Sequence, residues 1–177
     1  MIIHREGITM NFRGHVITNT VLTTAVVIGS RAQFETPYEY IASFSIGVIF
    51  ASIFLSPDLD LTISSPYKNF GPLRFIWFPY AKLFKHRGIS HSYFLGTFTR
   101  IAYLAIGLSA LLAGSIYLLD TVLNILRAEI LMGFADQLSA LALHWKDILG
   151  VFIIGVVFSD FCHVTTDRSW SKIKAIF

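Results

Sequence analysis

An uncharged apolar run in the middle of the chain constrains the fold more than any other feature. Residues Ile101–Leu119 carry no charged side chain, and they complete a longer apolar stretch that begins at Tyr93. A helix of about 20 apolar residues crosses the roughly 30 Å hydrocarbon core of a bilayer, because it satisfies its own backbone hydrogen bonds. The run therefore predicts a transmembrane helix.

The composition of the whole chain also indicates a membrane protein. Of the 177 residues, 54% are hydrophobic and 14% are charged, and the mean hydropathy is +0.63. A soluble domain carries about 25% charged residues. The net charge is +3, but the basic residues lie between apolar runs rather than in one patch, so we expect no nucleic-acid partner. The single cysteine, Cys162, excludes an internal disulfide, and the length suits one domain over residues 1–177.

Four apolar segments predict an all-α integral membrane protein with about four transmembrane helices. The other three are the weakly hydrophobic, threonine-rich His15–Gly29, the segment Tyr38–Leu55, and a last span that opens at Ile148–Phe158. Two further segments predict one or two interfacial amphipathic helices. Leu73–Phe84 combines aromatic and basic residues, and Asp120–Trp145 has apolar residues at helical spacing among charged ones.

The distribution of positive charge predicts the topology. With four spans, the two chain termini and the central loop lie on one side, which carries ten lysines and arginines against three on the other side. Cytoplasmic loops are enriched in these residues. We therefore expect both termini and the central loop in the cytoplasm, with the chain in an inner (plasma) or thylakoid-type membrane.

The densest polar segment of the chain is Lys85–Ser92, which contains His86, Arg87, Ser90 and His91. Lysine and arginine are common beside membrane spans, which explains the basic residues but not the histidines and serines. Neutral imidazole is the commonest metal ligand, and it also carries protons near neutral pH. The segment therefore predicts a functional site.

Two other groups of polar residues lie at the ends of the first two spans. His15 and Asn19 are four residues apart and share one helical face, which suits either a packing role or a ligand role. Asp58 and Asp60 follow Pro57 at the end of the second span. Carboxylates at a helix C-terminus oppose the helix dipole, so this pair calls for a metal ion or an arginine.

The last span ends in Asp160, His163 and Asp167, which are spaced three and four residues apart. If the helix continues, all three lie on one face. A carboxylate and an imidazole at this spacing can bind one ion, as helical Glu-x-x-His pairs do in di-iron bundles. The alternative is a buried salt bridge from Asp160 to Arg87 or to Arg100, although Arg100 can also extend to the membrane interface.

In the predicted topology, all these residues lie at the cytoplasmic face. The predicted metal ligands are His15, Asp58, Asp60, His86, His91, Asp160, His163 and Asp167. Imidazole and carboxylate ligands without sulfur suit Zn²⁺ best, with Mn²⁺ or Fe²⁺ as alternatives, and their number would allow two ions. In a catalytic site, Arg87 would bind an anionic group, His86 or Asp60 would act as the base, and Ser90 and Ser92 would orient the histidines.

Four motifs carry a resemblance to known families. They are His15-x-x-x-Asn19, Ser56-Pro57-Asp58-Leu59-Asp60, His86-Arg87-Gly88-x-Ser90-His91-Ser92 and Asp160-x-x-His163-x-x-x-Asp167. Together they resemble the uncharacterised metal-binding membrane proteins common in cyanobacteria, and also the related YdjM-like family, described as inner-membrane metal-dependent hydrolases. The resemblance covers most of the chain. It implies a metal site at the histidines and aspartates of these motifs, and it implies hydrolase activity.

Three functions remain open from the sequence. The first is a metal-dependent hydrolase that acts on a lipid or a phosphoester at the cytoplasmic face. The second is a non-catalytic scaffold in which the metal staples helix ends together. The third is a metal-independent lipid phosphatase of the phosphohistidine type, which His163-x-x-x-Asp167 partly resembles, although the accompanying Pro-Ser-Gly-His is missing. An open coordination position would separate the first two, and a metal requirement would separate both from the third.

Overall fold

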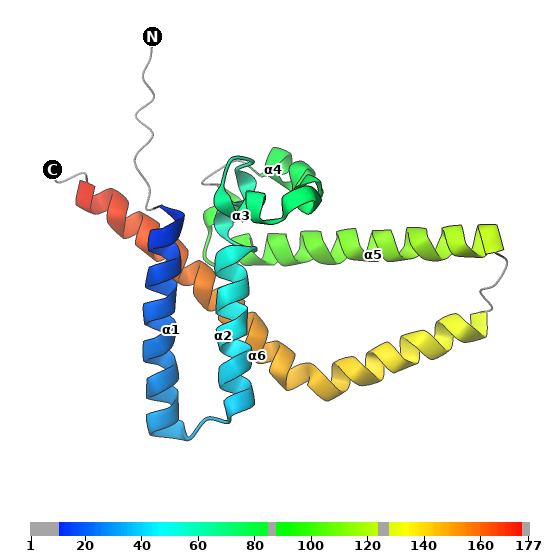
Figure 1. The fold of residues 1–177 in the computed structure, drawn as a ribbon, viewed down its shortest axis with the longest axis horizontal. Helices are drawn as coiled ribbons and strands as arrows, with labels where there is room; N and C mark the ends of the chain where they lie inside the picture. The colour runs from blue at the N-terminus through cyan, green and yellow to red at the C-terminus, as the bar shows by residue number, and fades with distance from the viewer. Residues whose placement is uncertain (1–10, 85–87, 124–127, 175–177) are drawn as a thin grey trace, which may run out of the picture.

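The computed structural model describes residues 11–84, 88–123 and 128–174, and every regular element in these ranges is a helix. The α-helices are α1 (Phe12–Phe34), α2 (Tyr38–Ile53), α3 (Ser65–Asn69), α4 (Phe78–Leu83), α5 (Leu95–Leu123) and α6 (Ala128–Lys174) (Figure 1). Three short 3₁₀ helices lie between them, namely η1 (Pro57–Asp60), η2 (Gly71–Trp77) and η3 (Ile89–His91). The all-α prediction is confirmed for the described residues.

Three helical stretches in the described ranges are long and apolar enough to cross a membrane. They are Tyr38–Asp60, Leu95–Thr121 and Met132–Ile173. The sequence predicted about four spans, and the remaining one, in α1, is not among these stretches. Its threonines, together with His15 and Asn19, make it the least hydrophobic of the predicted spans.

The prediction of a separate surface helix over Asp120–Trp145 is wrong. α5 extends to Leu123, and α6 runs without interruption from Ala128 through the expected last span to Lys174. No proline occurs between these two residues, so nothing in the sequence stops the helix once it has begun. At 1.5 Å per residue α6 is about 70 Å long, and Figure 1 shows that its yellow and orange-red parts run in different directions.

A close crossing of α2 and α6 organises the packed part of the molecule. A Cβ atom added to Gly47 would lie 2.2 Å from the carbonyl oxygen of Phe152, and one added to Gly155 would lie 2.3 Å from that of Phe44. Ser43 donates a hydrogen bond of 2.6 Å to a backbone carbonyl of α6. Small residues allow such an approach of two helix backbones. The crossing brings the end of α2 next to the C-terminal half of α6.

The connection between α2 and α5 folds around buried aromatic rings. Trp77 and Tyr80 are fully buried, and each ring lies 5.4–5.5 Å from the ring of Tyr103 on α5. The interfacial helix expected over Leu73–Phe84 is therefore two short pieces, η2 and α4, that share a core with α5. This packing holds η1 and η3 beside each other.

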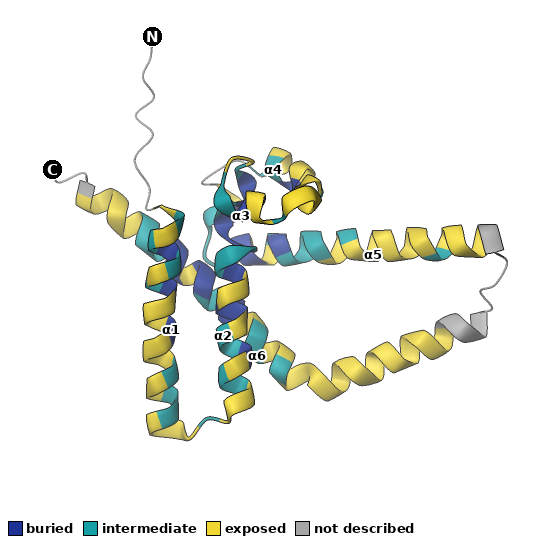
Figure 2. Cartoon of the chain, in the orientation of Figure 1, coloured by how far each residue is buried: buried dark blue, intermediate teal, exposed yellow. Residues whose placement is uncertain are grey.

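Burial is concentrated where α1, α2, the start of α5 and the C-terminal half of α6 meet (Figure 2). The rest of α5 exposes apolar side chains on every side, including Ile106, Leu108 and Leu111 at 61–70% exposure. A helix that is apolar all round is typical of a membrane span.

Candidate metal centre

Five side chains from four separate segments meet at one end of the packed region. They form two overlapping groups whose ligand atoms lie within 4.8 Å of one another, His15 with His163 and Asp167, and Asp58 with His91 and His163. We call these five residues the His–Asp cluster. The sequence predicted all five as metal ligands, and the helix ends bring them together.

His163 lies at the centre of the His–Asp cluster. Its Nε2 atom is 3.6 Å from a carboxylate oxygen of Asp58 and 3.6 Å from one of Asp167. His15 Nε2 lies 3.0 Å from Asp167, and His91 Nε2 lies 3.4 Å from Asp58. The rings of His15 and His163 stack with centroids 3.7 Å apart. His163 therefore faces both carboxylates, whereas His15 faces Asp167 and Nε2 of His91 faces Asp58.

α1 presents His15 to the cluster because of how the helix starts and how it is held. Asn11 caps the helix by accepting a hydrogen bond of 2.8 Å from the backbone of Gly14. His15 and Asn19 are 4% and 3% exposed, which confirms that they share one buried face. The amide nitrogen of Asn19 donates to Ser52 on α2 at 2.8 Å and to an α6 serine at 2.9 Å, so α1 is fixed against both neighbouring helices.

The tight 3₁₀ turn of η1 sends its two aspartates in different directions. Asp58 faces His91 and His163, whereas Asp60 is buried and accepts a hydrogen bond from the hydroxyl of Ser90. Asp60 also lies 3.6 Å from Nδ1 of His91, on the ring edge opposite the cluster. A carboxylate at this position orients a metal-binding imidazole and fixes its tautomer.

The η3 segment that carries His91 is held tightly in place. Arg100 donates a hydrogen bond of 3.0 Å to the carbonyl oxygen of Ser90. Gly96 lies so close to that same oxygen that an added Cβ would be 2.2 Å from it. Ser92 accepts a hydrogen bond of 3.0 Å from the backbone of Gly96, so it helps to start α5. The two other predicted residues of this motif, His86 and Arg87, lie outside the described residues.

Asp160 belongs to a different set of contacts. Its side chain is 1% exposed, and one carboxylate oxygen accepts hydrogen bonds from Thr97 and Arg100. Arg100 is fully buried. The structure therefore has the salt bridge that the sequence offered as an alternative for Asp160, and it keeps Asp160 out of both groups of the His–Asp cluster.

The distances within the His–Asp cluster suit a bound cation. Two ligands held about 2.1 Å from one tetrahedral ion lie about 3.4 Å apart, and the separations around His163 and His91 are 3.4–3.6 Å. Nε2 of His163 is buried and has no hydrogen-bond partner among the described residues. Two carboxylates among neutral imidazoles carry two negative charges, which a divalent ion would balance.

The pKa of His91 reflects the two carboxylates beside it. Burial by itself lowers the pKa of His91, but hydrogen bonds with Asp58 and Asp60 outweigh it and raise the pKa to about 9. Without a cation, a proton on His91 offsets part of the negative charge. A metal ion needs the neutral imidazole, so its binding must displace that proton.

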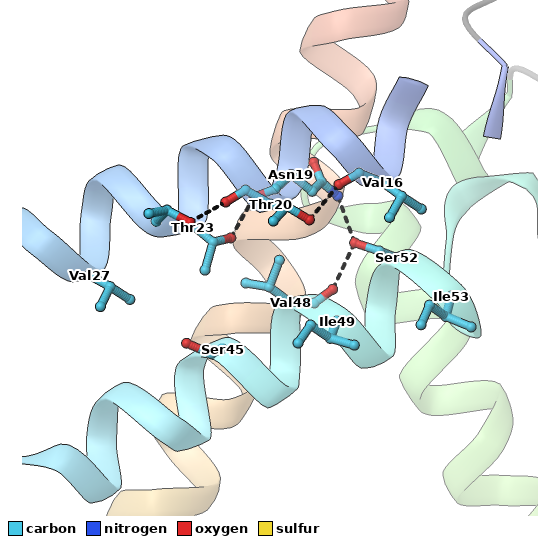
Figure 3. Close-up of a pocket in the computed structure, with 11 residues that line it drawn as sticks. Val16, Asn19, Thr20, Thr23, Val27, Ser45, Val48, Ile49, Ser52 and Ile53 are labelled. Atoms are coloured by element: carbon cyan, nitrogen blue, oxygen red, sulfur yellow. Dashed lines mark hydrogen bonds between the residues drawn. The ribbon is translucent and has the colours of Figure 1, made fainter. Parts of the chain in front are cut away.

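One pocket borders the His–Asp cluster, and a separate one lies along α1 and α2. A polar one of about 500 Å³ is lined by His91, Asp167 and basic residues of α6. Those basic residues, Arg168 and Lys172, entered the sequence analysis only as topology signals, although their spacing from Asp167 could have indicated a shared site. An apolar groove of about 280 Å³ lies between α1 and α2 (Figure 3).

Comparison with known proteins gives one family. A family model described as "Uncharacterized metal-binding protein (DUF2227)" matches residues 13–177. A curated protein named "Uncharacterized protein" from Aquifex aeolicus (strain VF5) is 46% identical over 68 residues, which is 38% of this chain. The matched part covers 48%, about half, of the length of that relative. No solved structure matches the chain.

Proposed function

The chain belongs to this family of uncharacterised metal-binding proteins, and from that premise we propose that it is a membrane-embedded, metal-dependent hydrolase. Its substrate is a lipid or a phosphoester reached at the cytoplasmic face. The observation that carries the proposal is the buried Nε2 atom of His163, which faces two carboxylates at 3.6 Å and has no hydrogen-bond partner in the described part of the chain.

The His–Asp cluster holds the ion. A single Nε2 atom binds one ion, and His163 is shared by both groups of ligands, so the geometry favours one ion over two. Three imidazoles and two carboxylates suit Zn²⁺, and also Mn²⁺ or Fe²⁺. A divalent ion bound there would polarise a substrate oxygen and lower the pKa of a coordinated water toward neutrality.

Residues next to the His–Asp cluster hold its ligands in position. Asp60 holds the ring of His91, and Ser90 in turn holds Asp60. Since Asp60 is buried and engaged in this way, we assign it to positioning rather than to proton transfer. Asp160 is assigned to the salt bridge with Arg100. A ligand or base role for His86 and an anion-binding role for Arg87 stay predictions.

The arrangement of helix ends supports a site at one membrane face. The cluster gathers the start of α1, the end of α2, the segment before α5 and the late part of α6, so its ligands lie where these helices meet, while α5 runs across the direction of α1 and α2 (Figure 1). The positive-charge bias puts that face and both termini in the cytoplasm of an inner or thylakoid-type membrane. The resemblance to YdjM-like proteins supports the hydrolytic activity.

A non-catalytic metal staple is the second candidate. It is favoured by the fact that the five ligands come from four segments, so that one ion would join them all. A polar pocket that opens onto two of the ligands favours catalysis instead, because a purely structural ion needs no access.

The test is the metal content of the detergent-purified protein by mass spectrometry, followed by assays with phosphoester and lipid substrates. We expect near-stoichiometric zinc, manganese or iron in the wild type and its loss in His163→Ala. The matched control is His144→Ala, which removes an exposed histidine from the same helix and should keep the metal. A wild type that binds no metal after reconstitution would overturn the proposal. A metal-bound protein that hydrolyses neither substrate class would leave the non-catalytic metal staple as the remaining function.

A further inference from the structure

The polar pocket combines two ligands of the His–Asp cluster with two cations. His91 and Asp167 line it beside the cluster, and Arg168 and Lys172 line it from α6. Arg168 and Lys172 are four residues apart, so they project from the same face of the helix. A volume of about 500 Å³ leaves room for a small polar group.

Arg168 is oriented by an aromatic contact. Its guanidinium carbon lies 4.5 Å from the centre of the Tyr93 ring, within the range of a cation–π interaction. Stacking on a ring occupies the flat face of the guanidinium and leaves the N–H groups at its edge available. These N–H groups match the oxygens of a phosphate or carboxylate.

The charges that line the pocket favour an anion once the cluster holds its ion. A divalent ion balances the carboxylates of Asp58 and Asp167. Among the residues that line the pocket, the remaining charges are those of Arg168 and Lys172, and both are positive. Hydrogen bonds from such groups to a phosphate are stronger than those between neutral groups.

We propose that this pocket binds the phosphate group of a phosphate ester, with Arg168 and Lys172 contacting its oxygens beside the metal ion. This inference rests on the proposed function, because it takes the His–Asp cluster to hold a divalent ion. It narrows the substrate class from lipids and phosphoesters in general to compounds that carry a phosphate anion.

The apolar groove between α1 and α2 offers a way to distinguish a lipid phosphate from a soluble phosphate ester. It runs along α1 and α2 from Val16 and Asn19 toward the middle of both helices (Figure 3). The hydroxyls of Thr20 and Thr23 donate to carbonyls of their own helix at 2.8 and 2.6 Å, so their methyl groups remain to line the groove. An acyl chain would fit such a surface, although no residue lines both the groove and the polar pocket.

The first experiment measures inorganic phosphate near the metal. Phosphorus-31 NMR of protein saturated with Mn²⁺ reports phosphate close to the ion through paramagnetic broadening, and electron paramagnetic resonance reports the bound Mn²⁺ separately. In the double variant Arg168→Gln/Lys172→Gln we expect phosphate affinity to fall about tenfold for each charge removed, with Mn²⁺ still bound. The control Arg13→Gln/Lys68→Gln removes the same charge from exposed positions outside the pocket and should retain wild-type affinity.

Unchanged broadening in the pocket variant with Mn²⁺ bound would overturn this inference and leave the metal centre intact. Absence of bound Mn²⁺, Zn²⁺ or Fe²⁺ in the wild type would overturn the proposed function instead, so the two failures are distinguishable.

A second arm identifies the source of the phosphate. If the natural ligand is a lipid, a short-chain phosphatidic acid binds at least tenfold more tightly than glycerol phosphate, and Thr20→Phe in the groove removes that gain. Ile17→Phe, on the exposed side of the same helix at 64% exposure, should not. Equal affinity for both compounds, unaffected by Thr20→Phe, would assign the pocket to a soluble phosphate ester.

Discussion

Two buried clusters lie about two turns apart on α6, and they are built from different partners. Around Asp160, the charged partner is the guanidinium of Arg100, and both side chains are at most 1% exposed. Around Asp167, the partners are the imidazoles of His15 and His163 at 3.0 and 3.6 Å. One carboxylate is neutralised by a permanent cation, and the other is surrounded by groups that are neutral when they act as ligands.

This difference indicates that the Asp160–Arg100 pair is structural and that the His–Asp cluster binds an ion. The pair of Asp160 and Arg100 has no net charge, so it is electrically complete when the chain has folded. The His–Asp cluster carries surplus negative charge, and this charge is what distinguishes it, since both clusters contain buried polar atoms without a hydrogen-bond partner among the described residues. Buried charge is tolerated only when it is paired or coordinates a metal. We therefore expect substitutions in the first cluster to change stability, and substitutions in the second to change metal binding.

The largest expected effect is that of Arg100→Met. Removing the guanidinium leaves Asp160 buried without its counter-charge and also removes the hydrogen bond to the carbonyl oxygen of Ser90. Loss of one partner from a buried pair costs about 3–5 kcal/mol. Denaturant unfolding in detergent should report this as a lower free energy of unfolding.

The double variant Arg100→Met/Asp160→Asn tests the cause. Because it removes both charges, it should recover part of the lost stability. A double variant less stable than Arg100→Met alone would show that the pair is not the reason for the loss. If the protein remains folded, either variant should still bind metal, with a lower affinity because Arg100 also holds the segment that carries His91.

A smaller effect is expected for Asp60→Asn, and it should fall on metal affinity. Asp60 contacts His91 from the side opposite the cluster and is itself held by Ser90. Loss of such an outer carboxylate lowers metal affinity about 10- to 100-fold. A competition assay with a fluorescent zinc chelator measures this change, and exposed Asp136→Asn on α6 serves as the control. An unchanged affinity would mean that Asp60 does not position His91.

The smallest expected effect is a gradual change of metal affinity with pH. The pKa of His91 is raised from 6.5 to about 9 without metal, so metal binding displaces a proton at neutral pH. Metal affinity should therefore increase with pH by up to about tenfold per unit and level off above pH 9. In the metal-free protein, the stability of the fold changes with pH in the opposite direction. The folded state binds this proton more tightly than the unfolded chain does, so stability is lost as the pH rises from 6.5 through 9.

Titrations of the same sample with and without Zn²⁺ would compare these two slopes. A metal affinity that does not change with pH in this range would contradict the raised pKa of His91.

Much of the local structure could be predicted from spacing. Apolar runs predicted helices at α2 and α5, and the ends differ from those observed by only a few residues. The four-residue spacings also held, since His15 and Asn19 share a buried face and His163 lies 3.6 Å from Asp167. These relations depend on the geometry of one helix, which the sequence specifies by itself.

The partners of each side chain were harder to predict. Asp58 and Asp60 are two residues apart and chemically identical, yet only Asp58 faces the cluster. The 3₁₀ turn that separates them is packed beneath η3, and the sequence has no signal for that contact. The continuity of α6 could not be predicted for a different reason. The charged residues over Asp120–Trp145 indicate a separate surface helix, although no residue near Trp145 stops a helix.

The sequence by itself therefore determined that the chain is helical, which residues share a helical face, and that imidazoles and carboxylates gather at helix ends. The tertiary structure decided that Asp160 meets Arg100, that Asp167 meets His15, and that Arg168 and Lys172 line a pocket beside the ligands. The physical reason is the distance along the chain over which each kind of contact is determined. Spacing along one helix fixes the direction of a side chain, whereas its partner is chosen by how closely helices far apart in the sequence can approach, here through the glycines where α2 crosses α6.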